Sequence, residues 1–279
     1  MTTAWYPETF KLAVVVPIFK SGKASQCSNY KPISLTTNLS KILEKLLKKR
    51  MISFLEKYNI LSDRQYGFRD KIGTSEAIEY LTNIFYDKLN NVEPVAAIFL
   101  DLQKAFDLVN HNILLAKLEN IGFRGLANKF FKSYLENRKQ VVKIENSVSD
   151  CKNVICGVQQ GSVLGPLLFL VYINDTLLKY SDNIIAFADD TTLVCNGENW
   201  IDVENDARNK INSISRCLNA NKLILNETIY NNKQHEQFNI SIYDRELKNV
   251  NETKMLGIFI DKNLRWKNKL IVLLVKLIT

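Results

Sequence analysis

The chain has 279 residues and a mass of 32.1 kDa, and hydrophobic residues make up 46% of it. This apolar content excludes a disordered, collagen-like or low-complexity chain, and the length suits one large domain or two small ones. The formal charge of +8 indicates an anionic partner such as nucleic acid without identifying it.

The positive charge is concentrated in the first quarter of the chain. Residues 1–75 carry 13 Lys and Arg against 5 Asp and Glu, whereas residues 76–279 carry 24 of each.

The five cysteines are odd in number and lack C-x-x-C spacing, which argues against a disulfide framework or a structural zinc site. No signal peptide is visible, and no apolar run reaches the roughly 18 residues of a membrane span. We therefore expect an intracellular protein of the cytoplasm or nucleus, neither secreted nor bound to a membrane.

The first half of the chain predicts helices around one buried strand. Apolar residues recur at helical spacing from Ser40, a candidate N-cap, to about Tyr58. The opposite face of this helix carries lysines: Lys45, Lys48 and Lys49. The elements predicted next are a helix at Thr74–Asn90, a strand at Val95–Leu100, a helix within 104–121, a helix at about Leu126–Asn137, and strands at Val141–Ile144 and Val154–Cys156.

The second half predicts an acidic hairpin between two helices. Two β-prone runs, Ile184–Ala188 and Thr191–Cys195, flank Asp189-Asp190, which predicts a hairpin with both carboxylates at its tip. The other predicted elements are helices at about Pro166–Leu178 and 201–219, and short strands near 238–243 and 255–260. Strands and helices alternate without a Rossmann fingerprint or a P-loop. This pattern predicts an α+β sandwich, an antiparallel sheet with helices packed on one face.

Three carboxylates follow predicted buried strands: Asp101, Asp189 and Asp190. Desolvation at the end of an apolar strand disfavours the charged form of an acid unless a cation compensates it. Oxygen ligands without nearby His or Cys favour Mg²⁺. If the two strands are neighbours, the three carboxylates predict a two-metal phosphoryl-transfer site. The alternatives are a plain Asp-Asp turn and a helix cap by Asp101.

Several segments, spread over nearly the whole chain, match the motifs of one known family in the order of that family. They are Val16–Leu35, Gln65–Ala77, Ala97–His111, Gly157–Asp175, Ala186–Asp190, Leu218–Asn226 and Lys254–Trp266. These segments resemble the motifs of reverse transcriptases of LINE-type (non-LTR) retrotransposons. The first two are similar to the fingers motifs, the next three to the palm motifs, and the last two to the later palm and primer grip.

The resemblance implies a single reverse transcriptase domain with a fingers-and-palm fold. It places the fingers at 1–92 and about 118–156, and the palm at 93–117 and about 157–260. Residues 261–279 would be the truncated start of the following region. A thumb is expected to be absent or truncated, because the chain stops inside an apolar segment.

The resemblance also implies roles for residues around the acids. Asp101, Asp189 and Asp190 become the metal-binding triad, with the Leu102 carbonyl as an extra ligand. Phe106 falls where the family has its steric gate, whose ring would exclude a ribose 2′-OH and so select dNTP. The alternative for Phe106 is that it begins the core stripe of its helix.

Four further residues match nucleotide contacts of the family. Gln160 and Gly161 correspond to its nucleotide-contacting Gln-Gly pair, in which glycine lets the backbone approach the sugar. Arg69 corresponds to a fingers arginine that grips the triphosphate. Lys31 stands where the family usually has arginine, so a weaker grip is expected.

Five lysines are candidate contacts to nucleic acid: Lys20, Lys23, Lys45, Lys48 and Lys49. The alternative for each of them is a solvated basic surface. Tyr66 and Phe68 could stack on the templating base or pack in the core. His111 and Asn174 recur in the motifs and are expected to be structural.

The expected function is that of an RNA-directed DNA polymerase. It would transfer dNMP from dNTP to a primer 3′-OH with two Mg²⁺ ions, or Mn²⁺ in their place, and its partners would be an RNA template, a DNA primer and dNTP. The family has a Lys-Thr pair where this chain has Ile229 and Tyr230, and that lysine is thought to protonate the departing pyrophosphate. The alternative is therefore a degenerate, inactive retroelement fragment that only binds nucleic acid. An unrelated Mg²⁺-dependent nucleotidyltransferase would leave the fingers motifs unexplained.

Overall fold

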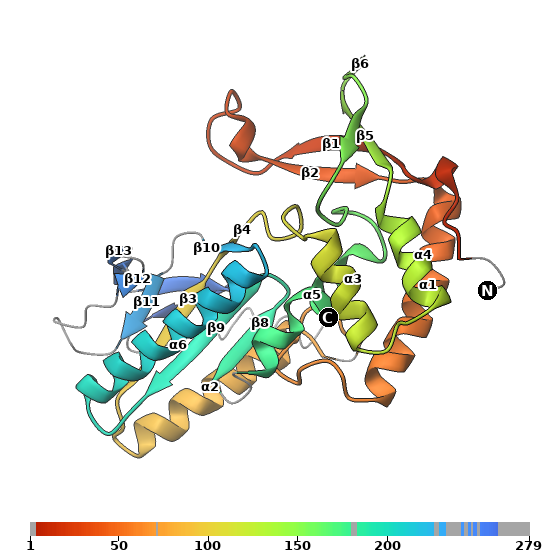
Figure 1. Ribbon diagram of the computed structural model, residues 1–279. Helices are drawn as coiled ribbons and strands as arrows, with labels where there is room; N and C mark the ends of the chain where they lie inside the picture. Colours follow the sequence, from red (N-terminus) through yellow and green to blue (C-terminus); the bar gives the residue numbers. More distant parts are fainter. Residues whose placement is uncertain are drawn as a thin grey trace, which may run out of the picture. The chain divides into compact units, whose positions relative to one another are not determined.

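The computed structural model describes residues 4–70, 72–179, 183–225, 229–232, 241–242, 245–246, 248–249 and 252–261. The chain forms two compact units, each built from segments that are distant in the sequence (Figure 1). Unit 1 contains residues 1–62, 104–178 and 221–223, and unit 2 contains residues 63–103, 179–220 and 224–279. No helix in the described part of the chain is both long and apolar enough to cross a membrane.

Unit 1 combines a small sheet with four helices. The strand order is β2-β1-β5-β6 with β7 also paired to β5, and only the β1–β5 pair is parallel. The strands are β1 (Leu12–Phe19), β2 (Tyr30–Leu35), β5 (Arg138–Ile144), β6 (Ser147–Val148) and β7 (Lys152–Val154). The helices are α1 (Asn38–Lys57), α3 (His111–Asn120), α4 (Leu126–Leu135) and α5 (Gly165–Leu178), with short 3-10 helices η1 (Glu8–Phe10) and η2 (Cys27–Asn29).

Helix α5 is the most apolar element of unit 1. Residues 167–174 are all buried, as expected for a helix that is hydrophobic on every side. Helix α1 is amphipathic instead, and buries Leu47, Met51 and Leu55 at a spacing of four residues. The sheet and these helices therefore give unit 1 a core of its own.

Two helix starts in unit 1 differ from the prediction. Helix α1 begins after Thr37, whose hydroxyl accepts the Ser40 N–H at 3.2 Å, so Ser40 is not the N-cap. Helix α3 occupies only the end of the predicted range 104–121, because the Asn110 side chain caps it by accepting the Ile113 N–H at 3.1 Å. The preceding turn includes Lys104 with φ 47°, a value outside the helical region.

Unit 2 is built on a five-stranded sheet with the order β14-β11-β3-β9-β8, antiparallel except for the β11–β14 pair. Its strands are β3 (Val95–Leu100), β8 (Ile184–Phe187), β9 (Asp190–Asn196), β11 (Ile229–Asn232) and β14 (Lys248–Asn249). Its helices are α2 (Thr74–Asn90) and α6 (Trp200–Ala220). Three two-stranded pairs complete it: β4 (Leu102–Gln103) with β10 (Ile224–Leu225), β12 (Ser241–Ile242) with β13 (Arg245–Glu246), and β15 (Glu252–Met255) with β16 (Ile258–Asp261).

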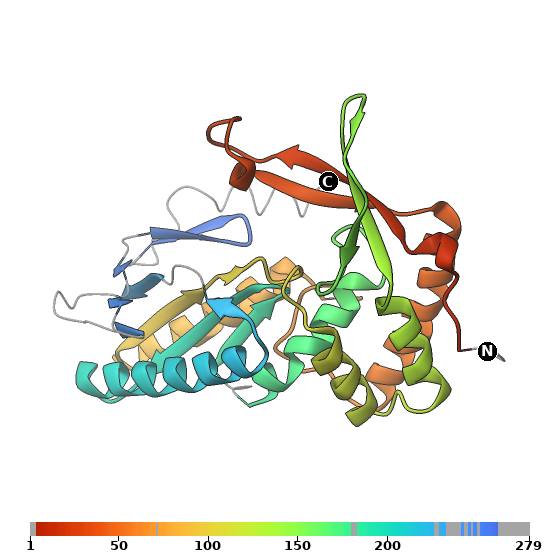
Figure 2. The same cartoon turned by 45° about the horizontal axis from the view of Figure 1, so that its top comes forward.

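Helices cover both faces of the unit 2 sheet, not one face as predicted (Figure 2). On one face, Val95 and Val194 pack in a cluster with Leu81 of α2. Cys195 follows Val194 and so faces the other side of the sheet. There burial raises the pKa of its thiol, and the charges of Lys210 and Asp206 on α6 also affect that pKa. The reason is that β3 and β9 are buried at nearly every position, so both sheet faces need apolar cover.

The strand predicted near 255–260 is a hairpin in the structure. Its turn residues, Leu256 and Gly257, have φ values of 48° and 90°. Positive φ at both central residues is what a type I′ hairpin turn requires. Because Leu256 is apolar, the sequence has no turn signal at this position.

Candidate active site

Two carboxylates come from neighbouring strands of the unit 2 sheet. Leu100, the last residue of β3, pairs with Thr191 of β9. Asp101 follows Leu100 and Asp190 precedes Thr191, so the antiparallel register places both acids at one end of the strand pair and on the same face. The two strands are therefore neighbours, which meets the condition on which the two-metal hypothesis depended.

The third carboxylate, Asp189, lies in the turn between β8 and β9. Phe187 pairs with Asp190, so the two turn residues are Ala188 and Asp189, one position earlier than predicted. Ala188 has φ 60°, and a positive φ at the first turn residue is what a type II′ turn requires. Alanine carries no turn signal, which explains the error of one residue.

Residues 64–67 are bound to the outer edge of β8 beside this turn. The Tyr66 N–H donates to the Ala186 carbonyl and the Ala186 N–H donates to the Arg64 carbonyl, each at 2.8 Å. The buried Gln65 side chain accepts a hydrogen bond from the Ala188 N–H at 2.9 Å. Sequence reasoning gave Gln65 no role, although it lies in a segment that resembles a fingers motif.

The environment of Asp190 disfavours its charged form. Burial raises the pKa of Asp190, and the negative charges of Asp189 and Asp101 raise it further. The carboxylates are therefore close enough for a cation placed among them to favour their charged forms.

The donor set fits a hard divalent cation. All the donors are carboxylate oxygens, which Mg²⁺ prefers over nitrogen and sulfur ligands. In the described ranges, no group of three or more His, Cys, Asp or Glu side chains is arranged as a metal site. The acids are thus neighbours and not a preformed cage.

The backbone after Asp101 is also held in a strand pair. Leu102 of β4 pairs with Leu225 of β10, and its side chain is buried. In β11, Ile229 pairs with Phe99 and Tyr230 pairs with Ile98, so the position of the family's missing lysine lies in the same sheet as the acids.

In unit 1, Gln160 and Gly161 lie in the loop before α5 and pack against β2. The Ser34 N–H donates to the Gln160 carbonyl at 2.7 Å. Gly161 has φ 109°, and a Cβ there would lie 2.6 Å from the Ser34 carbonyl oxygen, so glycine is required. The Gln160 amide donates to the Asp107 carboxylate at 3.4 Å. Burial raises the pKa of Asp107 above its ordinary value, and this hydrogen bond offsets only part of that rise.

Phe106 lies in the turn that precedes α3. Its ring stacks on that of Phe169 in α5, with centroids 4.7 Å apart and an interplanar angle of 23°. Its carbonyl accepts the Val158 N–H at 2.8 Å. Helix α3 starts only at His111, so Phe106 precedes it, but the ring packs against the buried Phe169 as the core alternative expects.

The basic candidates are distributed over both units. Six lysines belong to unit 1, on the β1–β2 hairpin and on α1: Lys20, Lys23, Lys31, Lys45, Lys48 and Lys49. All six are exposed except the half-buried Lys48. Arg69 belongs to unit 2, where its guanidinium donates to the Gln65 carbonyl at 3.5 Å. Of its aromatic neighbours, Tyr66 is buried in the core of unit 2 and Phe68 is exposed.

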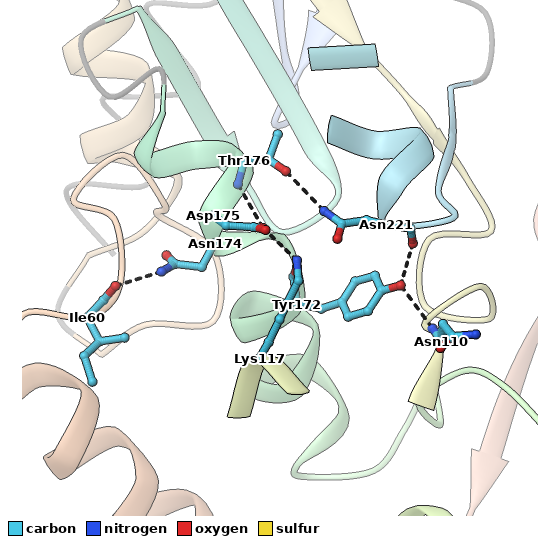
Figure 3. Close-up of polar contacts among 8 residues, drawn as sticks. All are labelled: Ile60, Asn110, Lys117, Tyr172, Asn174, Asp175, Thr176 and Asn221. Carbon is cyan, nitrogen blue, oxygen red and sulfur yellow. Dashed lines mark hydrogen bonds and ion pairs between the residues drawn. The ribbon is translucent and has the colours of Figure 1, made fainter. Parts of the chain in front are cut away.

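A polar network joins α3, α5 and the loop after α6 within unit 1 (Figure 3). The Tyr172 hydroxyl donates to the Asn221 carbonyl and accepts the Asn110 N–H. Beside it, the Lys117 ammonium pairs with the Asp175 carboxylate at 2.7 Å. These contacts hold α5, the helix that follows the Gln160–Gly161 loop.

His111 and Asn174 have structural partners, as expected. His111 Nε2 lies 2.8 Å from the Gly157 carbonyl, and burial lowers the pKa of its imidazole. Asn174 accepts the Ser62 N–H at 2.8 Å and donates to the Ile60 carbonyl at 2.7 Å (Figure 3). Both side chains hold loops in unit 1.

Comparison with known proteins decides the family. The family model described as reverse transcriptase (RNA-dependent DNA polymerase) matches residues 18–258. The chain belongs to the reverse transcriptase family. It is 38% identical over 172 residues to the probable RNA-directed DNA polymerase from transposon BS of Drosophila melanogaster, covering 61% of this chain and 19% of that protein. It is 29% identical over 280 aligned residues to the RNA-directed DNA polymerase from mobile element jockey of the same species, covering 95% and 30%.

The reverse transcriptase fold is also seen in solved structures. Truncated apo telomerase from Candida tropicalis matches with a TM-score of 0.61 at 15% identity, covering 92% of this chain and 54% of that chain. Apo telomerase from the same species matches with a TM-score of 0.62 at 14% identity, covering 91% and 47%. The α+β class and the LINE-type resemblance are thus confirmed. This reverse transcriptase chain spans less than a third of the length of the two curated relatives named above.

Proposed function

We propose that the chain is the polymerase part of a non-LTR retrotransposon enzyme that extends a primer 3′-OH on an RNA template with dNTP. The observation that supports this most is the convergence of Asp101, Asp189 and Asp190, whose charges raise the pKa of Asp190. Asp101 and Asp189 would hold Mg²⁺ together with the Leu102 carbonyl, and Asp190 would assist them.

The chain's own residues contribute mainly positioning. Two bound Mg²⁺ ions, or Mn²⁺ in their place, would activate the primer hydroxyl and neutralise the leaving pyrophosphate. Gly161 would let the backbone beside Gln160 approach the sugar, and the Phe106 ring would exclude a 2′-OH. Arg69 and Lys31 would bind the triphosphate, Arg69 with two parallel donors and Lys31 as a point charge.

We also propose a division of labour along the chain. Residues 1–92 and about 118–156 would form the fingers, and 93–117 and about 157–260 the palm. The lysines at positions 20, 23, 45, 48 and 49 would contact phosphates of the template and primer.

Primer extension on an RNA template tests the function directly. We expect the purified chain to extend the primer in Mg²⁺, and Asp189→Asn to lower the rate by roughly 100-fold or more, because one donor to the cation is weakened. Asp87→Asn is the matched control, since Asp87 is an exposed acid on α2 of the same unit. Salt-sensitive RNA binding without any extension by the wild type would identify a non-catalytic relic and contradict the proposal.

A further inference from the structure

A buried glutamine holds the turn that carries the acid pair. The Gln65 side-chain oxygen accepts two backbone hydrogen bonds, from the Ala188 N–H at 2.9 Å and from the Gly67 N–H at 2.8 Å. Gln65 is 1% exposed. Because both partners are donors, they fix the orientation of the amide: its NH₂ group cannot take the place of the oxygen.

We infer that Gln65 is a positioning residue for Asp189 and Asp190, an inference that rests on the proposed function. Asp189 directly follows Ala188, so the hydrogen bond from Gln65 acts on the peptide next to the acid pair. Ala188 has φ 60°, a conformation that costs an alanine energy and persists only where surrounding contacts enforce it. The Gln65 side chain supplies one of those contacts.

The backbone on both sides of Gln65 makes the support rigid. Arg64 and Tyr66 are both hydrogen-bonded to Ala186 of β8, two residues before the turn residue that Gln65 binds. A Cβ at Gly67 would lie only 2.4 Å from the Ala188 nitrogen, so the segment and the turn are in direct contact. A shift of residues 64–67 would therefore shift the turn.

The charge of the triad explains why an amide serves here and a carboxylate would not. A glutamate at position 65 would accept the same two N–H groups, because a carboxylate oxygen is an even better acceptor. It would also bring a fourth negative charge next to a turn that already carries two. Gln65 Nε2 is buried and has no hydrogen-bond partner among the described residues, so a charged oxygen in its place would be buried without a hydrogen-bond donor of its own.

Three variants separate positioning from general stability. Gln65→Met keeps the length of the side chain and removes the acceptor. Gln65→Glu keeps the acceptor and adds the charge. Asn174→Leu is the matched control, because Asn174 is also a buried amide that accepts a backbone N–H, that of Ser62, but it belongs to unit 1, whereas the turn belongs to unit 2.

Amide hydrogen exchange at Ala188 is the first readout, and it needs no enzymatic activity. We expect about 10-fold faster exchange in Gln65→Met, because the acceptor is lost, and unchanged exchange in Gln65→Glu and Asn174→Leu. The second readout is the kinetics of primer extension. Gln65→Met should lower kcat about 10-fold and leave KM for dNTP unchanged, because the acids lose their alignment and the nucleotide contacts stay intact.

The outcomes separate this inference from the proposed function. Unchanged exchange at Ala188 in Gln65→Met, or equal losses of kcat in Gln65→Met and Asn174→Leu, would overturn the positioning role. If the wild type is inactive but shows the expected exchange pattern, the result supports the hydrogen bond by which Gln65 holds the turn. It then contradicts only the proposed function. If Gln65→Met does not fold, faster exchange at Ala188 in Gln65→Glu, which keeps the acceptor, overturns the inference.

Discussion

At the scale of single residues, the charged Asp190 carboxylate destabilises the protein when no cation is bound. Burial and two negative neighbours raise the pKa of Asp190 above its value in the unfolded chain. Between the two pKa values, the folded protein therefore binds more protons than the unfolded chain does. Its stability falls as the pH rises from about 4 through the pKa of the folded state, and it stays lower above that pH.

Asp190→Asn should accordingly stabilise the protein in a metal-free buffer at neutral pH. We expect a gain of a few tenths of a kcal/mol, and at most about 1 kcal/mol, because the side chain is partly exposed and solvent screens the repulsion. The gain should vanish near about pH 3, where Asp190 is neutral in both states. Urea unfolding with EDTA at several pH values measures it, with Asp87→Asn as control. A variant less stable than the wild type at neutral pH would contradict the argument.

At the scale of elements, the sequence predicts the bounds of a helix or strand where a local apolar pattern determines them. The helix at Thr74–Asn90 and the strand at Val95–Leu100 have the predicted bounds, because the strand is an unbroken apolar run and the helix keeps its apolar spacing to its end. Predictions failed where one residue in an unusual conformation or a side-chain cap sets the boundary, as at Leu256, Asn110 and Thr37.

The residues of the candidate site likewise divide into those that a local sequence pattern indicates and those that it does not. The three acids could be found because each follows an apolar strand, whereas Gln65 and Glu44 act through partners more than a hundred residues away. Glu44 lies on the helix that carries the lysines, yet it is fully buried. Its carboxylate accepts the Val163 and Leu164 N–H groups before α5 at 2.7 and 3.0 Å. No spacing in the sequence indicates such a contact.

Glu44 therefore offers a test of how α1 is joined to α5 within unit 1. Glu44→Leu should lower the free energy of unfolding by about 3 kcal/mol, because two buried N–H groups lose their acceptor. Glu44→Gln keeps one accepting oxygen and should cost about half as much. Urea denaturation measures both changes, and Glu56→Gln, an exposed acid on the same helix, should be neutral. Equal stability of Glu44→Leu and Glu56→Gln would show that the buried contact contributes nothing.

At the scale of the whole molecule, the fold sharpens the charge asymmetry of the sequence. The segments of unit 1 carry 20 Lys and Arg against 9 Asp and Glu, whereas those of unit 2 carry 17 against 20. Unit 1 thus has a net charge of +11 and unit 2 of −3, and the acid triad belongs to unit 2. The unit that attracts phosphates and the unit that would hold the cation are therefore distinct, so phosphate binding and metal binding can be weakened separately.

The lysines of α1 test whether this charge contacts nucleic acid or is only solvated. Each phosphate contact to a single strand contributes about −0.7 to the slope of log K against log[salt], so replacing Lys45, Lys48 and Lys49 by Gln should reduce the slope by about 2. The control replaces three cations that already pair with neighbouring carboxylates, Lys88, Lys132 and Arg208. Binding of a single-stranded RNA at several salt concentrations measures both triple variants. Equal slopes would mean that α1 presents a solvated surface and that the template lies elsewhere on unit 1.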